Sequence, residues 1–307
     1  MVPYLLRRLA QSVFVLIGIT LFVSFTIRLS GDPAVAMFQG SSAPTQEQLA
    51  IIRARLGTDR PFSEQYLRFL AGAVRGDLGT SFRTGGPVGA AVMARFPATV
   101  GLALASLAIS LAIAVPLGVL AARRRGSLID LVVRIITLFG LSFPNFWLGI
   151  MLILIFGVHL RWLPPSGFEG PVSYVLPSLT LGLILASSTT RLVRSALLDV
   201  LGEQYVVTAR AKGVREDIVV YRHALRSALI PVVTFVGLQI GGLIGGVVII
   251  EQVFAWPGLG SLALNAISYR DYPMLQGTII VLALFIALIN LLVDVSYAAL
   301  DPRIRYT

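Results

Sequence analysis

Long apolar runs separated by short polar segments fill most of this 307-residue sequence. About 20 consecutive apolar residues are enough to cross a bilayer as a helix. Six runs reach or approach that length and carry no charge or almost none. They span residues 9–27, 97–122, 135–158, 171–190, 228–250 and 277–300. The pattern predicts an all-α integral membrane protein with six transmembrane helices.

The first run has an alternative interpretation as a cleaved signal peptide. Arg7 and Arg8 precede it, and the small-residue pattern Ala34-Val35-Ala36 follows it. The apolar region of a signal peptide is about 7–15 residues long, and this run is longer. We therefore expect a retained first helix.

Residues 28–95 are polar and mixed in charge, unlike the rest of the chain. Glycine and proline mark turns near residues 31–33 and 85–87, and charged helical stretches are expected at 47–56 and 63–74. These features predict a folded extramembrane insertion. We accordingly divide the chain into residues 1–94, the first helix with the insertion, and residues 95–307, a five-helix core with a cytoplasmic loop at 199–227.

Composition supports a membrane protein and argues against a nucleic-acid-binding one. Hydrophobic residues make up 56% of the chain and charged residues 13%, against roughly 25% charged in soluble domains. The net charge of +10 could suggest nucleic acid. However, most arginines lie between apolar runs, where anionic membrane lipid and membrane orientation account for them.

The distribution of positive charge predicts the orientation. With the N-terminus inside, fifteen Lys and Arg residues fall in cytoplasmic segments, and the two short outer loops hold only Arg161 and Arg270. Cytoplasmic loops of membrane proteins carry this excess, whereas a long insertion can be translocated whatever its charge. We expect both termini in the cytoplasm of a multi-pass protein of the cell membrane.

The longest polar segment of the C-terminal half, residues 203–231, predicts a helical hairpin. Val206 and Ala209 recur at helical spacing before Gly213, and Ile218, Tyr221 and Leu225 do so after it. Glycine suits the left-handed turn between two short helices. Small and basic residues give the hairpin a surface to which another protein could bind. The alternative interpretation is a solvated cytoplasmic loop. The small and basic residues are Thr208, Ala209, Arg210, Ala211, Lys212, Gly213, Arg215 and Arg222.

Prolines and glycines mark special positions within the predicted spans. Pro116, Pro144, Pro177 and Pro231 each remove a backbone hydrogen bond and favour a kink. Two overlapping G-x-x-x-G pairs allow a second helix to approach closely, either within the same bundle or across a subunit interface. These glycines are Gly241, Gly242, Gly245 and Gly246.

Asn145 and Asp294 are candidate pathway or interface residues. Asn145 directly follows Pro144, and Asp294 is the only ionisable residue well inside an apolar run. Ionisable residues within membrane spans usually face protein or water and have a function. The alternative for Asp294 is a solvated or arginine-paired position near the cytoplasmic interface.

Several kinds of chemistry are missing from the sequence. The only lysine is Lys212, so no G-x-x-x-x-G-K-[ST] nucleotide-binding loop exists. There is no cysteine, and the predicted topology separates His159 from His223, which excludes a histidine zinc pair. We expect no catalytic residue, cofactor or metal in this chain.

Six segments resemble the ABC importer permeases of the dipeptide/oligopeptide type. T-A-R-A-K-G at 208–213 and R-H-A-L-R at 222–226 are similar to the coupling loop of that family, although the general E-A-A pattern of the loop is only half met. Val207 and Thr208 stand at two of its three positions, and Arg226 replaces its proline. Residues 76–82, 138–158, 245–277 and 301–306 also resemble the family.

The resemblance implies a type I ABC importer permease fold with a cytoplasmic coupling-helix hairpin, forming half of a translocation path for di- or oligopeptides or a similar ligand. It implies a second homologous permease, two ATP-binding cassette subunits that bind ATP and Mg, and an extracytoplasmic substrate-binding protein. Glutathione, haem and nickel remain open as substrates. The alternative function is an ion-coupled secondary transporter, which needs an intramembrane relay of ionisable groups.

Overall fold

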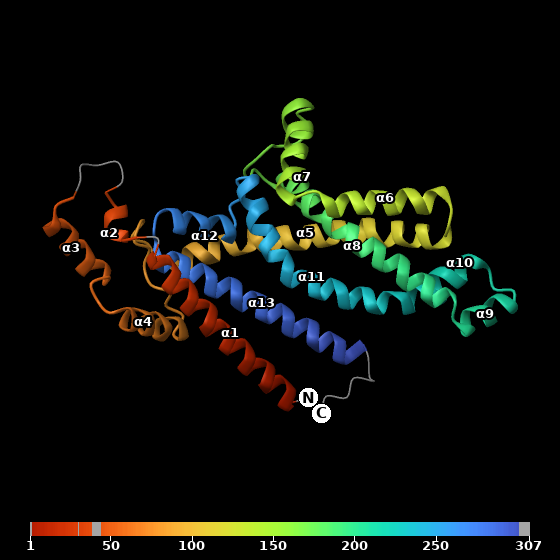
Figure 1. Cartoon of the computed structure of the whole chain (residues 1–307), viewed down its shortest axis with the longest axis horizontal. Coiled ribbons are helices and arrows are strands. Elements are labelled where there is room, and N and C mark those ends of the chain that lie inside the picture. The colour runs from red at the N-terminus through yellow and green to blue at the C-terminus, as the bar shows by residue number, and fades with distance from the viewer. Residues whose placement is uncertain (1, 30, 39–43, 301–307) are drawn as a thin grey trace. The chain divides into compact units, whose positions relative to one another are not determined.

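The structure is a computed structural model that describes residues 2–29, 31–38 and 44–300, and these residues form helices joined by short connections (Figure 1). Within these ranges no strand occurs, and one isolated bridge joins Thr80 to Pro87. The all-α prediction is confirmed. The first helices are α1 (Val2–Leu29), α2 (Pro33–Ala36), α3 (Gln46–Leu56), α4 (Phe62–Val74), α5 (Val88–Arg123), α6 (Leu128–Ser142) and α7 (Asn145–Leu152). The remaining ones are η1 (Ile153–His159), η2 (Pro171–Tyr174), α8 (Val175–Leu201), α9 (Gln204–Ala211), α10 (Glu216–Ile218), η3 (Val219–Ala224), α11 (Leu225–Val253), α12 (Leu259–Ser268) and α13 (Tyr272–Leu300).

Helices of membrane-spanning length coincide with the predicted apolar runs. Five are long and apolar enough to cross a bilayer: Ala10–Leu29, Val88–Arg123, Pro171–Leu201, Glu216–Leu243 and Tyr272–Val293. A sixth span is formed if the bent pair of α6 with α7 and η1 counts as one. These helices make the chain a multi-pass membrane protein.

The third predicted span is broken rather than kinked. Its two parts, Leu128–Ser142 and Asn145–His159, meet at 104°. Phe143 and Pro144 between them are both extended, with ψ of 136° and 140°. A proline disfavours the helical conformation of the residue before it, which places the helix end at Ser142. The effect of Pro144 is therefore larger than the kink that the sequence predicts.

The chain divides into two compact units. The described residues of the first lie before Val100 and in Pro257–Leu288, and those of the second lie in Val100–Trp256 and from Ile289 to Leu300. The first unit contains the polar insertion, in which α3 and α4 confirm the helices expected at 47–56 and 63–74.

Polar contacts join α1 to its neighbours in the first unit. The hydroxyl of Tyr66 in α4 lies 2.9 Å from the Thr20 hydroxyl and donates to the Ile17 carbonyl at 3.0 Å. From α13, the Gln276 amide donates to the Ser24 hydroxyl at 2.7 Å. Buried polar groups require such partners, so α1 packs as an integral part of this unit.

A buried carboxylate fixes the segment at residues 76–87, which we call the outer segment. Asp271, 3% exposed, accepts hydrogen bonds from the Ser81 hydroxyl at 2.5 Å and the Phe82 amide at 3.0 Å. It also accepts from the amides of Arg83 and Met274. One side chain therefore both starts α13 and holds the outer segment.

The second unit is organised around α8, which packs against α6, α7 and α11. Glycines permit its close approach to α5. A Cβ atom at Gly118 would lie 2.6 Å from the Val193 side chain, and one at Gly182 would lie 2.7 Å from that of Ile109. Any larger residue at either glycine would force α5 and α8 apart.

Candidate functional site

The predicted hairpin is present, and its first arm ends as the glycine indicates. Helix α9 ends at Ala211, and Gly213 follows with φ of 75°, in the left-handed region. The Val214 amide donates to the Ala209 carbonyl at 3.2 Å, and the Gly213 amide donates to that of Arg210 at 2.9 Å. These two bonds form a Schellman motif, in which glycine avoids the steric penalty of a side chain.

The second arm differs from the predicted short helix. Helix α10 passes into the π-helix η3 and then into α11 without interruption, so the arm is the beginning of a long helix. The wider π turn changes which side chains face inward. Ile218 and Tyr221 are 41% and 54% exposed, whereas Val219 and Val220 are fully buried. Ile218 and Tyr221, which recur at helical spacing in the sequence, therefore lie on the exposed side of this arm.

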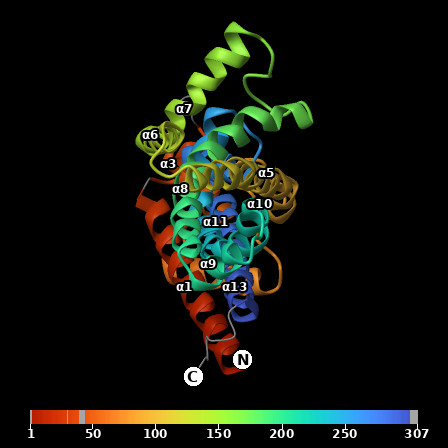
Figure 2. The ribbon, with the colours of Figure 1, turned by 90° about the vertical axis from the view of Figure 1, so that its right-hand side faces the viewer.

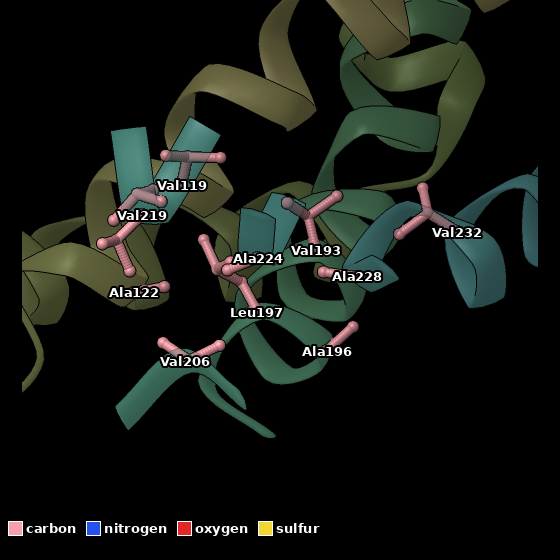
Figure 3. Close-up of a cluster of buried hydrophobic side chains, with 11 residues drawn as sticks. Val119, Ala122, Val193, Ala196, Leu197, Val206, Val219, Ala224, Ala228 and Val232 are labelled. Atoms are coloured by element: carbon pink, nitrogen blue, oxygen red, sulfur yellow. The ribbon is translucent and has the colours of Figure 1, made fainter. Parts of the chain in front are cut away.

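A compact apolar cluster anchors both arms, which we call the hairpin stem (Figure 3). Val206 of α9 and Val219 of η3 are fully buried, and they share the cluster with Leu197 of α8 and Val119 of α5. Burying a valine side chain contributes about 1.5–3 kcal/mol. The cluster consists of Val119, Ala122, Val193, Ala196, Leu197, Val206, Val219, Val220, Ala224, Ala228 and Val232.

The predicted gripping residues lie on the opposite, exposed side of the hairpin. In Figure 2, α9 and α10 lie at the near end of α8 and α11. Seven of the eight residues are exposed, and Ala209 is partly buried against the stem. The exposed ones are Thr208, Arg210, Ala211, Lys212, Gly213, Arg215 and Arg222. The structure thus leaves these small and basic groups exposed on the hairpin, and we call them the hairpin tip.

Ion pairs fix part of this surface. Arg210 forms two hydrogen bonds to the Glu216 carboxylate, at 3.0 and 2.7 Å, across the Gly213 turn. These bonds raise the pKa of Arg210 above its usual value. Arg123, at the end of α5, pairs with Asp217 at 2.8 Å. The two arms are therefore connected to each other and to α5 on the outside as well as through the stem.

A basic pocket of about 510 Å³ lies between the end of α5 and the hairpin. Its lining includes Arg123, Arg124, Arg125 and Arg210, with Glu216 as the one acidic residue. An acidic group on a neighbouring molecule would therefore meet several cations beside the hairpin tip.

A buried ion pair that the sequence pattern does not reveal lies next to this region. Asp130 is 1% exposed and receives two hydrogen bonds from Arg194, at 2.6 and 2.9 Å. The Gly126 amide also donates to it, at 3.0 Å. The pair ties the turn between α5 and α6 to α8. Ser127 is the N-cap of α6, and its spacing to Asp130 is a local signal for the start of that helix. Nothing in this spacing indicates that Asp130 pairs with the distant Arg194.

The four glycines of α11 face in two directions. A Cβ at Gly241 would contact Asn290, and one at Gly246 would contact Asn145 and Leu181, all within this chain. Gly242 and Gly245 are exposed and have no such neighbour within 4 Å in the described structure. Only these two glycines leave room for another helix.

The two candidate pathway or interface residues, Asn145 and Asp294, differ in what the structure describes of them. Asn145 is partly exposed at the start of α7, and its amide nitrogen would lie 3.4 Å from a Cβ at Gly246. It therefore lies at the contact between α7 and α11. Asp294 belongs to α13, but its side chain lies outside the described residues.

Comparison with protein families gives two matches that together cover most of the chain. Residues 114–306 match the family described as "Binding-protein-dependent transport system inner membrane component". Residues 1–103 match the N-terminal region of such membrane components.

Curated proteins give full-length similarities. The chain is 42% identical over 307 residues to the glutathione transport system permease protein GsiC of Escherichia coli K12, covering 100% of both chains. It is 43% identical over 308 residues to the protein of the same name from Pectobacterium atrosepticum, again over 100% of both chains.

Solved structures share the fold at lower sequence identity. The MetNI methionine ABC transporter, in an inward-facing conformation, matches with a TM-score of 0.57 and 21% identity. The match covers 69% of this chain and 96% of that chain. An amino acid ABC transporter matches with a TM-score of 0.50 and 14% identity, over 68% of this chain and 94% of the other. The fold is that of type I ABC importer permeases.

Proposed function

The chain belongs to the family of binding-protein-dependent transport system inner membrane components, and from this premise we propose how it works as the permease subunit of an ABC importer. Permeases of this kind are non-catalytic, so the chain is not an enzyme. Family membership also decides against the alternative of an ion-coupled secondary transporter.

We propose short peptides as the cargo, with glutathione as the first candidate. The support is the full-length similarity to permeases named for glutathione transport. Uptake of labelled glutathione and of a dipeptide by cells with and without the complete transporter would test this. Loss of dipeptide uptake alone would support a general peptide importer instead.

The proposed assembly follows from the family. A second, related permease would complete the translocation path, two cytoplasmic ATP-binding cassette subunits would bind ATP and Mg, and an extracytoplasmic protein would deliver cargo. The division at residues 94 and 95 stays a proposal, in which the insertion faces the delivering protein and residues 95–307 form the translocation core.

One observation carries the proposed mechanism: the hairpin has a buried stem and an exposed tip. The stem makes the hairpin rigid, because Val206 and Val219 of the hairpin pack against residues of α5, α8 and α11. The tip presents Ala211, Gly213 and basic side chains to a partner. We therefore propose that the tip docks on an ATP-binding cassette subunit, and that closure of the two ATPase subunits displaces the hairpin and alternates access to the path.

Replacement of Gly213 by valine tests this coupling. Gly213 has φ of 75° and open space around its Cα, so the valine strains the turn and adds bulk at the tip. We expect normal membrane insertion, but ATP hydrolysis that cargo-loaded binding protein no longer stimulates. Gly167→Val is the matched control, because Gly167 has φ of 81°, similar open space, and lies outside the hairpin. Wild-type stimulation in Gly213→Val would contradict the proposal.

The proposal requires the tip to be cytoplasmic, which the charge distribution predicts. The chain has no native cysteine, so labelling of a single introduced cysteine reports directly which side of the membrane that position faces. A cysteine at Gly126 should react only with membrane-permeant reagents, and one at Gly167 should react from outside in intact cells. Labelling of the Gly126 cysteine from outside would show that the predicted orientation is wrong.

The exposed glycines of α11 support a permease-to-permease contact. Gly245→Leu should lower the yield of intact complex, because a leucine separates the two backbones. Gly18→Leu is the control, since Gly18 is also an exposed span glycine with nothing within 4 Å in the described structure. Equal yields for Gly245→Leu and wild type would remove this assignment.

A further inference from the structure

Two cavities in the first unit are not used by the proposed coupling mechanism. The first has a volume of about 360 Å³ and the second about 300 Å³. Both are lined by Arg28, Arg60, Gln65 and Tyr272, so they adjoin each other between α1, the insertion and α13. We call the pair the arginine cleft. Its volumes are at the small end of the range of about 300–1,000 Å³ found for small-molecule sites.

Positive charge dominates the lining of the arginine cleft. The first cavity is lined by Arg28, Arg53 and Arg60, with Asp32 as its one acidic residue. The second is lined by Arg28, Arg60 and Arg68, with Asp77 as its one acidic residue. Arg53 is already paired with Asp32 at 2.6 Å, and Arg60 and Arg68 both pair with Glu64, at 2.6 and 2.8 Å. Counting Glu64, the four arginines of the cleft meet three carboxylates, and the remaining positive charge favours a ligand with negative charge.

Arg28 carries much of this excess charge, because no carboxylate lies within 4 Å of it in the described residues. Its guanidinium donates to the Ser24 carbonyl and, at 2.6 Å, to the Gln65 side-chain oxygen. The rings of Phe62 and Tyr272 lie 4.6 and 5.3 Å from it. Cation–π contacts and neutral acceptors hold this side chain in place, but they leave its charge without an anion.

A second, independent feature of the first cavity also points to a ligand. The Thr58 hydroxyl is buried and has no hydrogen-bond partner in the described structure, and Thr58 lines the first cavity together with Arg28 and Arg60. A buried polar group without a partner destabilises the fold. A ligand that accepts a hydrogen bond from this hydroxyl removes this destabilisation.

We propose that the arginine cleft binds a small organic carboxylate of up to tripeptide size. Arginine recognises carboxylates through paired, charge-assisted hydrogen bonds, and the Thr58 hydroxyl supplies a further donor. The site differs from the coupling hairpin in both residues and chemistry. The proposed site does not rest on the proposed transport function, because ligand binding to it can be measured without ATP and without the binding protein.

Binding is measured on the complete transporter in lipid nanodiscs without nucleotide or binding protein. The probes are reduced glutathione and succinate, with glutathione dimethyl ester as the carboxylate-free control. At least one free carboxylate should bind saturably, and the ester should not. Arg60→Gln should weaken binding about tenfold, as expected for the loss of a charge-assisted hydrogen bond. Arg55→Gln is the matched control, because Arg55 lies on the same insertion but lines neither cavity.

Thr58→Val separates a ligand site from a merely structural cluster. The valine has nearly the same shape and removes a hydroxyl that bonds to nothing in the described protein. We expect an unchanged or higher melting temperature together with severalfold weaker carboxylate binding. The proposal is overturned if neither probe binds, if the ester or inorganic phosphate binds as well, or if binding is equal in wild type, Arg60→Gln and Thr58→Val.

Discussion

The hairpin and the outer segment both connect helices and are both held against them, but by different kinds of contact. The hairpin is fixed by apolar side chains, among them the fully buried Val206 and Val219. The outer segment is fixed by one carboxylate, Asp271, and by the Arg83 guanidinium stacked 3.3 Å from the Tyr269 ring centre.

This difference determines how each region responds to mutation. An apolar cluster distributes its stabilisation over many side chains, and each truncation removes only a part. A buried carboxylate concentrates it, because its loss leaves several donors without an acceptor. The outer segment should therefore depend on one residue, and the hairpin on none in particular.

The largest expected effect is at Asp271. Asp271→Ala leaves the amides of Phe82, Arg83 and Met274 without this acceptor, and should cost about 3 kcal/mol. We expect a lower melting temperature and faster proteolysis within residues 76–87. Asp59→Ala, at an exposed position, is the control. An Asp271→Ala protein as protease-resistant as wild type would remove the contrast between the two regions.

A smaller effect is expected in the hairpin stem, where two adjacent valines provide an internal comparison. Val206 is fully buried and Val207 is 55% exposed. Val206→Ala should destabilise the hairpin by about 2 kcal/mol, from the lost burial and the cavity left behind. Val207→Ala should change it little. Hydrogen exchange of the α9 amides measures both, and equal protection in the two variants would show that the stem does not anchor the hairpin.

The smallest effect is expected at the hairpin tip. The Arg215 side chain is 81% exposed and lies 3.8 Å from the Asp217 carboxylate. Exposed ion pairs contribute only about 0–1 kcal/mol. Arg215→Ala should therefore leave the melting temperature and ATP-dependent uptake close to wild type. A strong loss of uptake without loss of stability would identify Arg215 as a specific contact of the tip.

Features with a local physical cause could be predicted from the sequence. The spans follow from the length of apolar runs, and the Gly213 turn follows from the tolerance of glycine for positive φ. The helices at 46–56 and 62–74 were recognisable by their turn signals and helical pattern. The side of the second arm that faces solvent could not be predicted, because the π turn breaks the 3.6-residue period from which a buried face is read.

Features that depend on distant residues could not be predicted. Asp130 and Arg194 are 64 positions apart, and Ser81 and Asp271 are 190 positions apart. In the sequence each of these looks like an ordinary polar residue outside the apolar runs. The segments at 76–82 and 245–277 each resembled the permease family separately, and only the fold shows that they contact each other through Ser81 and Asp271. The proline at position 144 indicated a disturbed helix, but the sequence could not predict the 104° angle. That angle also depends on how α7 packs against α8 and α11.

The uninterrupted passage from α10 through η3 into α11 has a mechanical consequence. From Glu216 to Val253 the chain forms one rod, roughly 55 Å long at about 1.5 Å per residue. It contains no loop that could absorb a displacement applied at one end. Force applied beside Gly213 would therefore be transmitted along the helix past the apolar stem, and Pro231, inside α11, is the position where the helix would bend most easily.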